Sequence, residues 1–168
     1  MRIDPPTAAA LKAVIESDLA SITQLTASLR SLAGLSDPQP AERDVIAAGY
    51  YLHNIYNALE NTFDQVSRTF ENHVKDHTRW HQELLHKMFL DMQPVRPAVL
   101  PLESKPLLDD LRGFRHRFRH SYDYPLDASR VATLAQAWLD HAASVCDALR
   151  SLARQLAEVA DSPPSRYG

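Results

Sequence analysis

The chain has 168 residues, of which 45% are hydrophobic and 23% are charged, and this composition is typical of one globular domain with a buried core. Its formal net charge of −3 at pH 7 excludes the overall positive field of a protein that coats nucleic acid without specificity. The single cysteine, Cys146, excludes an intramolecular disulfide framework and a cysteine-rich metal site. Because the sequence has neither a signal-peptide pattern nor a run of about 18 apolar residues, we expect a cytoplasmic protein that does not bind membranes.

The first half of the chain predicts two long helices. Apolar residues recur at helical spacing over residues 7–33, and two prolines precede this segment. Gly34 stands where a C-terminal cap is expected, and Pro38 and Pro40 prevent continuation of the helix. Residues 41–72 predict a second helix, whose apolar stripe consists of Leu52, Tyr56, Leu59, Phe63, Val66 and Phe70.

The second half predicts three more helices. Residues 76–92 form the third, and the following stretch, "QPVRPAVLPLESKP", has four prolines, so we expect an extended connector on the surface. A fourth helix begins near Pro106 and ends around Tyr124, because Pro125 disfavours helical geometry in the residue before it. The fifth starts near Asp127, a suitable N-cap, and its apolar stripe includes Trp138, which we expect in the core.

These patterns together predict an all-α fold. We expect a bundle of about five helices, in which the long first, second and fifth helices pack with the shorter fourth. No repeat and no alternating strand pattern is evident. Residues 1–161 are expected to form a single domain, and residues 162–168 a flexible C-terminal tail.

The fourth helix carries a cationic cluster, "RGFRHRFRHSY", at residues 112–122, with four arginines and two histidines. At about 100° per residue, Arg112, Arg115 and Arg119 form one stripe, and His116 and His120 form a pair four residues apart. Arginine offers a planar fork of donors to a phosphodiester, and histidine accepts and returns a proton near neutral pH. These are the minimum requirements for metal-free RNA cleavage, in which the ribose 2′-OH attacks its own phosphate. The alternative interpretation is an ordinary solvated helix face.

The spacing within the cluster bears on the oligomeric state. Arg115 and His120 are separated by about 140° on an ideal helix. They reach one substrate only if the arginine bends round, the helix end unwinds, or a second copy of the chain contributes. The spacing therefore favours a dimeric site.

The same residues resemble a known family. "RHRFRHSY", residues 115–122, matches the pattern R-x4-H-x-Y of HepT-type toxins, the ribonuclease members of the HEPN superfamily. The upstream segments "YYLHNIYNALENTFDQVSRTFE", "WHQELL" and "RPAVLP" also resemble HepT-like proteins and occur in the same order. The resemblance covers residues 41–127. It implies a HEPN-like helical bundle that dimerises and places two motif helices together as a composite ribonuclease site.

The resemblance also implies roles for individual residues. Arg115 would bind and stabilise the scissile phosphate, and His120 would act as general acid or base. Tyr122 would be the hydroxyl that an MntA-type nucleotidyltransferase antitoxin modifies with AMP, which adds negative charge and bulk beside the arginines. His116 stands where the family often has Asn, so it either orients the site or shares the proton transfer.

Two further arginines of the cluster, Arg112 and Arg119, are candidates with His116 for binding phosphate or RNA. The resemblance thus implies the toxin of a toxin–antitoxin system, a metal-independent endoribonuclease that cleaves tRNA or mRNA without a cofactor. Its expected partners are RNA, the nucleotidyltransferase antitoxin and a second copy of the chain. The alternative is a non-catalytic HEPN-like module that binds a nucleotidyltransferase or a nucleotide.

Three other groups of residues raise alternatives. His73, His77 and His81 have the four-residue spacing of metal ligands on a helix, although exposed histidines are the simpler interpretation. The aromatic stripe of Tyr50, Tyr56 and Phe63 suits core or dimer-interface packing, with base stacking as an alternative. Glu60 and Asn61 interrupt an otherwise apolar segment, so each either contacts the fourth helix or faces solvent.

Overall fold

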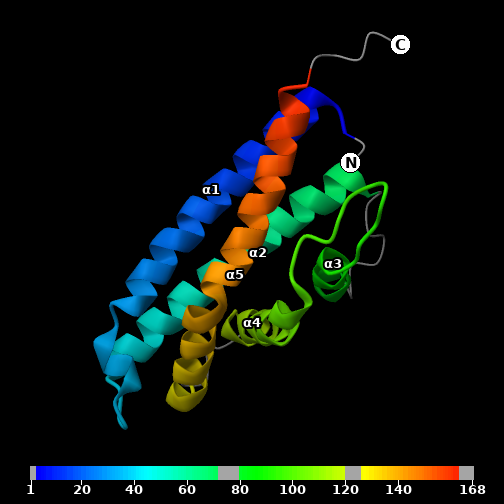
Figure 1. Cartoon of the computed structure of the whole chain (residues 1–168). Coiled ribbons are helices and arrows are strands. Elements are labelled where there is room, and N and C mark those ends of the chain that lie inside the picture. The colour runs from blue at the N-terminus through cyan, green and yellow to red at the C-terminus, as the bar shows by residue number, and fades with distance from the viewer. Residues whose placement is uncertain (1–2, 72–79, 120–125, 163–168) are drawn as a thin grey trace.

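The computed structural model describes residues 3–71, 80–119 and 126–162, apart from the side chains of residues 33 and 36. The described residues form five α-helices and no β-strand, which confirms the all-α prediction (Figure 1). The helices are α1 (Pro5–Arg30), α2 (Glu42–Phe70), α3 (Trp80–Met88), α4 (Lys105–Phe118) and α5 (Ala128–Ala160). Two short 3₁₀ turns, Ala33–Ser36 and Leu102–Ser104, lie between them.

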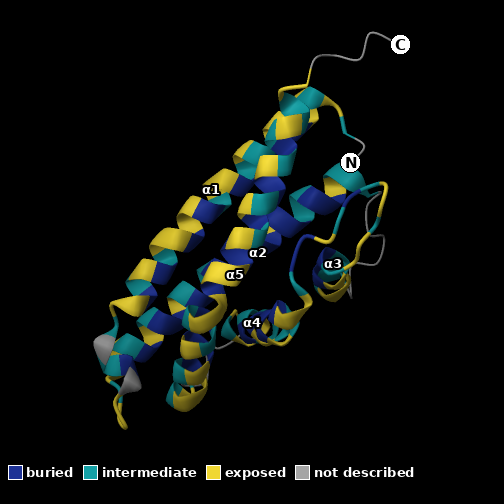
Figure 2. Cartoon of the chain, viewed as in Figure 1, coloured by how far each residue is buried: buried dark blue, intermediate teal, exposed yellow. Residues whose placement is uncertain are grey.

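The long helices α1, α2 and α5 form the body of the bundle, as predicted. In Figure 1, α1 and α5 run side by side, α2 crosses behind α5, and the short helices α3 and α4 lie to one side. Each long helix turns its buried face toward its neighbours and its exposed face toward solvent (Figure 2). This division follows the sequence period, because apolar residues three and four apart share one helix face.

The helix starts follow local capping chemistry. The carboxylate of Asp4 accepts a hydrogen bond from the backbone N–H of Thr7 at the start of α1. Asp127 accepts one from the N–H of Arg130 at the start of α5, which confirms the predicted N-cap. Both caps satisfy a backbone donor that the first helical turn leaves without a partner.

The core contains most of the residues that the apolar stripes predicted. Trp138 is fully buried, and its indole Nε1 donates to Thr26 Oγ1 at 2.9 Å, which satisfies its one polar atom. Cys146 is buried in α5, and this burial raises the pKa of its thiol. Of the second-helix stripe, Phe70 is only half-buried, and the others are buried.

The proline-rich connector differs from the prediction. It is not a regular helix before α4 begins at Lys105, as expected, but it does not lie wholly on the surface, because Val99 and Leu100 are buried in the core and Arg96 is fully buried. The backbone N–H groups of Val99 and Leu100 donate to the carbonyl of Met88 at 2.8 and 3.1 Å. The connector therefore folds back over the end of α3, which ends at Met88 rather than near residue 92.

The buried Arg96 is fully satisfied by its surroundings. Its Nε donates to Glu71 Oε1 at 3.0 Å, and its other nitrogens donate to Glu71 and to the carbonyls of Lys87, Leu90 and Pro97. A guanidinium has five donors, so it can hold several segments of irregular backbone together. The sequence offered no signal for this, since an arginine among prolines is usually exposed.

The fourth helix ends at Phe118, and Tyr124, where the sequence placed its end, lies outside the described residues. No helix in the described ranges combines the length and the apolar character that a membrane crossing requires.

Candidate functional site

The helix that carries the cationic cluster, α4, is fixed on α2 by aromatic packing. Phe114 is buried and Phe118 half-buried, and their ring centroids lie 5.6 Å apart. Gly49 of α2 makes this close approach possible, because a Cβ at this position would lie 3.0 Å from Phe118 Cε2 and from Leu126 Cδ1. The His53 ring of α2 also packs on Phe118, with centroids 5.1 Å apart. This packing sets which α4 side chains face α2.

Arg115 is the α4 residue that this docking directs toward α2. Its Nη2 lies 2.9 Å from Glu60 Oε2, and its Nε donates to Asn57 Oδ1 at 2.6 Å. The side chains of Arg115 and Glu60 are only 15% and 8% exposed, so water screens the pair weakly. Two side chains of α2 therefore hold the guanidinium in a fixed orientation.

Two histidines extend these contacts on either side. Glu60 Oε1 accepts a hydrogen bond from His81 Nδ1 at 2.6 Å, and the amide nitrogen of Asn57 lies 2.9 Å from His53 Nε2. We call the set of His53, Asn57, Glu60, His81 and Arg115 the Arg115 network. It joins α2, α3 and α4 through consecutive polar contacts, which restrict the orientations that its members can adopt.

The contacts assign the hydrogen positions of His53. Because Asn57 Oδ1 accepts from Arg115, its amide nitrogen faces His53 Nε2 and must donate to it. In the neutral ring the proton is therefore on Nδ1, which is buried and has no partner among the described residues. Burial, followed by the charges of Arg115 and Arg119, lowers the pKa of His53, so the neutral ring is favoured.

Two open depressions meet at Arg115. The first, which we call the α2 groove, has a volume of about 450 Å³. It is lined by His53, Asn57, Glu60, Asn61, Asp64, Trp80, Arg115 and Arg119. The second, the α3–α4 hollow, has a volume of about 340 Å³. It is lined by His81, Gln82, Arg112, Gly113, Arg115, His116 and Arg117.

The structure thus divides the predicted cationic cluster between two depressions. Arg119 shares the α2 groove with Arg115, whereas Arg112 and His116 line the α3–α4 hollow. Arg112 makes one long contact, 3.5 Å from its Nη2 to Asp109 Oδ1, and its Nε is buried without a partner in the described part of the chain. The predicted stripe of three arginines is therefore not a single surface.

The two other predicted site residues, His120 and Tyr122, lie outside the described residues. Their roles, and the convergence of His120 with Arg115 on one substrate, stay predictions.

Sequence reasoning anticipated part of the Arg115 network and missed the rest. Glu60 contacts α4, which was one of the two alternatives left open for it. Asn61 is exposed, which was the other alternative, and it donates to Asp18 of α1 at 2.9 Å. His53 and Asn57 were missed, although their spacing of four residues on a strongly amphipathic helix was a signal that a polar stripe faces another element.

The possible histidine metal site is not tested as a whole, because His73 and His77 lie outside the described residues. The third residue, His81, binds Glu60 in the structure. Within residues 3–71, 80–119 and 126–162, no group of three or more His, Cys, Asp or Glu side chains is placed to hold a metal ion.

The aromatic stripe of α2 separates into two environments. Tyr56 and Phe63 are buried in the core, whereas Tyr50 is 55% exposed. Burial, with the nearby charge of Glu60, raises the pKa of Tyr56 far above its ordinary value, so its phenol stays protonated. Core packing is thus confirmed for two of the three residues.

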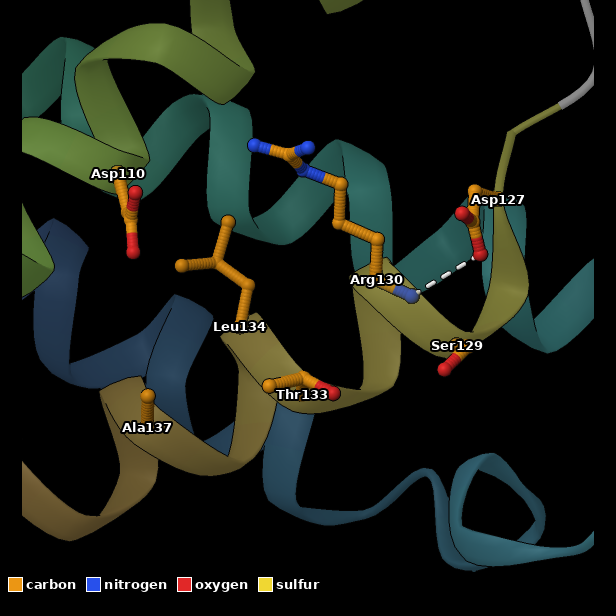
Figure 3. A pocket seen from close by; sticks show the side chains of 7 residues that line it. All are labelled: Asp110, Asp127, Ser129, Arg130, Thr133, Leu134 and Ala137. Carbon is orange, nitrogen blue, oxygen red and sulfur yellow. Dashed lines mark hydrogen bonds between the residues drawn. The ribbon is translucent and has the colours of Figure 1, made fainter.

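A further hollow of about 370 Å³ lies where α4 meets the start of α5 (Figure 3). Asp110 and Asp127 stand on opposite sides of it, and Arg130 reaches between them. With two carboxylates to one guanidinium, this hollow suits an anion less well than the two depressions beside Arg115. Its other lining residues are Ser129, Thr133, Leu134 and Ala137.

Comparison with known proteins agrees with the pattern in the sequence. A family model described as HepT-like protein matches residues 47–156, which include the whole Arg115 network and all of α4. The curated proteins and the solved structures that were compared give no match to this chain.

Proposed function

This chain belongs to the HepT-like protein family, and we propose that it is the toxin of a toxin–antitoxin system, a metal-independent endoribonuclease that cleaves tRNA or mRNA in the cytoplasm. The observation that carries the proposal is the fixed orientation of Arg115. Its Nε and Nη2 are held by α2, and no described residue binds its remaining nitrogen, Nη1. A guanidinium held in this way offers a pre-oriented donor to an RNA phosphate, and such pre-orientation removes the cost of reorganisation during the reaction.

The proposed reaction uses the RNA's own nucleophile. A general base removes the proton of a ribose 2′-OH, and the 2′ oxygen attacks the adjacent phosphorus as the bond to the 5′ oxygen breaks. A general acid gives that leaving oxygen a proton, so the products are a 2′,3′-cyclic phosphate and a 5′-OH end. Arg115 stabilises the charge on the phosphate, and His120 is the general acid or base. DNA lacks the 2′-OH and would not be cut.

A homodimer is part of the proposal. Ile46 and Tyr50 of α2 are 52% and 55% exposed and lie four residues apart on one helix face. The same face continues to His53 and Asn57, which line the α2 groove. Large apolar side chains beside a polar site are typical of an interface core. A second copy docked there would bring its own motif helix near Arg115, as the resemblance implies.

Regulation by a nucleotidyltransferase antitoxin completes the proposal. Tyr122 follows Arg119 by three residues, so an AMP group on its hydroxyl would place negative charge beside the arginines. The modification would therefore block RNA by occupying its phosphate site.

The test is RNA cleavage and growth arrest by the full chain and its variants. We expect Arg115→Ala and His120→Ala to abolish both, and Arg154→Ala and His141→Ala, exposed residues of α5, to leave both intact. Arg115→Lys keeps the charge but loses the planar fork, so it separates loss of folding from loss of chemistry. The proposal is wrong if Arg115→Ala and His120→Ala stay fully active. Tight binding of ATP or of the antitoxin, with every RNA left intact, would support the non-catalytic module instead.

A further inference from the structure

The α3–α4 hollow is a separate depression beside the proposed reaction site. It shares with the α2 groove only one lining residue, Arg115. One guanidinium therefore stands between two depressions, one on each side. A linear ligand that contacts Arg115 in its middle can enter both.

The hollow is strongly cationic. Its lining includes three guanidinium groups, those of Arg112, Arg115 and Arg117, and no described carboxylate lines it. Glu60 neutralises Arg115, and Asp109 contacts Arg112 only at 3.5 Å. Arg112 Nε has no partner in the described part of the chain. The balance of charge leaves donors that an anion can satisfy.

Arg117 lies over Gly113 on one side of the hollow, with Nη1 and Nη2 at 3.8 and 3.9 Å from where a Cβ of Gly113 would be. Arg117 is an exposed residue that lines the hollow, so its guanidinium is accessible to a ligand there. The opposite wall comes from α3, through His81 and Gln82.

We propose that the α3–α4 hollow binds the RNA phosphate next to the scissile one. This inference rests on the proposed function. When the scissile phosphate is at Arg115, one neighbouring phosphate of the same strand lies in the hollow, where Arg112 and Arg117 hold it. The ligand class is a single-stranded RNA of at least three nucleotides, recognised by its backbone and not by its bases.

The test compares a dinucleotide, which has one phosphate between its nucleosides, with trinucleotides that have one more. Each substrate has a single ribose, and the other sugars are 2′-deoxy, so only one link can be cut. Two trinucleotides place the extra phosphate on the 5′ or the 3′ side. We expect the wild type to cleave one of them with a kcat/KM about tenfold above that of the dinucleotide, as a charge-assisted contact would give.

In Arg117→Ala this ratio should fall toward one, and Arg117→Lys should restore part of it, because lysine retains the charge. Arg154→Ala makes the same change of charge on α5, at an exposed position, and should keep the wild-type ratio. The inference is overturned if Arg117→Ala keeps the ratio, or if Arg154→Ala lowers it as much.

A binding measurement separates this inference from the proposed function. Fully 2′-deoxy oligonucleotides cannot be cut, and their affinity is measured by fluorescence anisotropy over a range of salt concentrations. We expect Arg117→Ala to weaken trinucleotide binding and to reduce the slope of log K against log salt by about 0.7. If no RNA is cleaved but this slope changes, the ribonuclease proposal fails while the phosphate site stands. If Arg117→Ala weakens ATP binding and leaves oligonucleotide binding unchanged, the hollow binds a free nucleotide and the inference is wrong.

Discussion

Replacement of Glu60 by glutamine tests the Arg115 network most directly. The carboxylate binds Arg115 Nη2 at 2.9 Å with one oxygen and His81 Nδ1 at 2.6 Å with the other. In Glu60→Gln the amide oxygen can still accept from Arg115, and the amide nitrogen can donate to His81 if that ring changes its tautomer. Both contacts are then kept, and the principal loss is the charge on Glu60.

The size of the effect follows from that loss. A hydrogen bond to a charged group contributes about 1.5–3 kcal/mol and a neutral one about 0.5–1.5 kcal/mol, so we expect Glu60→Gln to lower the free energy of unfolding by about 1–1.5 kcal/mol. For a chain of 168 residues this corresponds to a fall in Tm of about 2–6 °C. Glu60→Ala removes both contacts and leaves a guanidinium that is only 15% exposed without its partner, so the loss approaches about 3 kcal/mol.

Urea unfolding and RNA cleavage are measured on the same variants. A misplaced catalytic group costs about tenfold to a hundredfold in rate. We therefore expect Glu60→Gln to lower kcat by a larger factor than the factor by which it changes KM. Asp147→Asn is the matched control, since this exposed carboxylate of α5 pairs with Arg150 at 2.7 Å and is 71% exposed. If Glu60→Gln matches the wild type in both stability and cleavage, Glu60 does not hold Arg115.

Four further predictions follow from other parts of the molecule. Arg96→Ala should lower the free energy of unfolding by about 3–5 kcal/mol in urea titrations, because it removes a buried guanidinium from the buried Glu71 carboxylate and from three backbone carbonyls. Burial opposes ionisation of Glu71, but hydrogen bonds from Lys87 and Arg96 outweigh it and hold the pKa of Glu71 below its ordinary value. The free energy of unfolding should therefore fall as the pH drops below 4.5, and this fall should be smaller in Glu71→Gln. Burial lowers the pKa of His53, so its contribution to the free energy of unfolding is complete above pH 6.5 and is lost at lower pH. In His53→Gln the free energy of unfolding should therefore depend less on pH between pH 7 and 5. An unchanged pH dependence would contradict the burial of His53. Tyr50→Glu should convert the proposed dimer to monomers in sedimentation equilibrium, whereas Tyr50→Phe should not. If Tyr50→Glu is still a dimer, the dimer interface does not include Tyr50.

The sequence by itself determined the helices and the core. Helical periodicity and proline positions predicted five helices, because burial of an apolar stripe and local capping act over a few residues at a time. Trp138 was placed correctly in the core for the same reason. The cationic cluster was also evident, since it lies within a single helix and its spacing can be worked out from helix geometry.

Only the tertiary structure decided how that cluster is used. Arg115 and Asn57 are 58 residues apart in the chain, and their contact depends on how Phe118 packs beside Gly49. The burial of Arg96 likewise depends on Glu71, 25 residues away, and on carbonyl groups that irregular backbone happens to present. Polar contacts between distant segments leave no periodic trace in the sequence, because each requires only one residue at each end. The division of the arginines between two depressions is therefore a property of the packed helices.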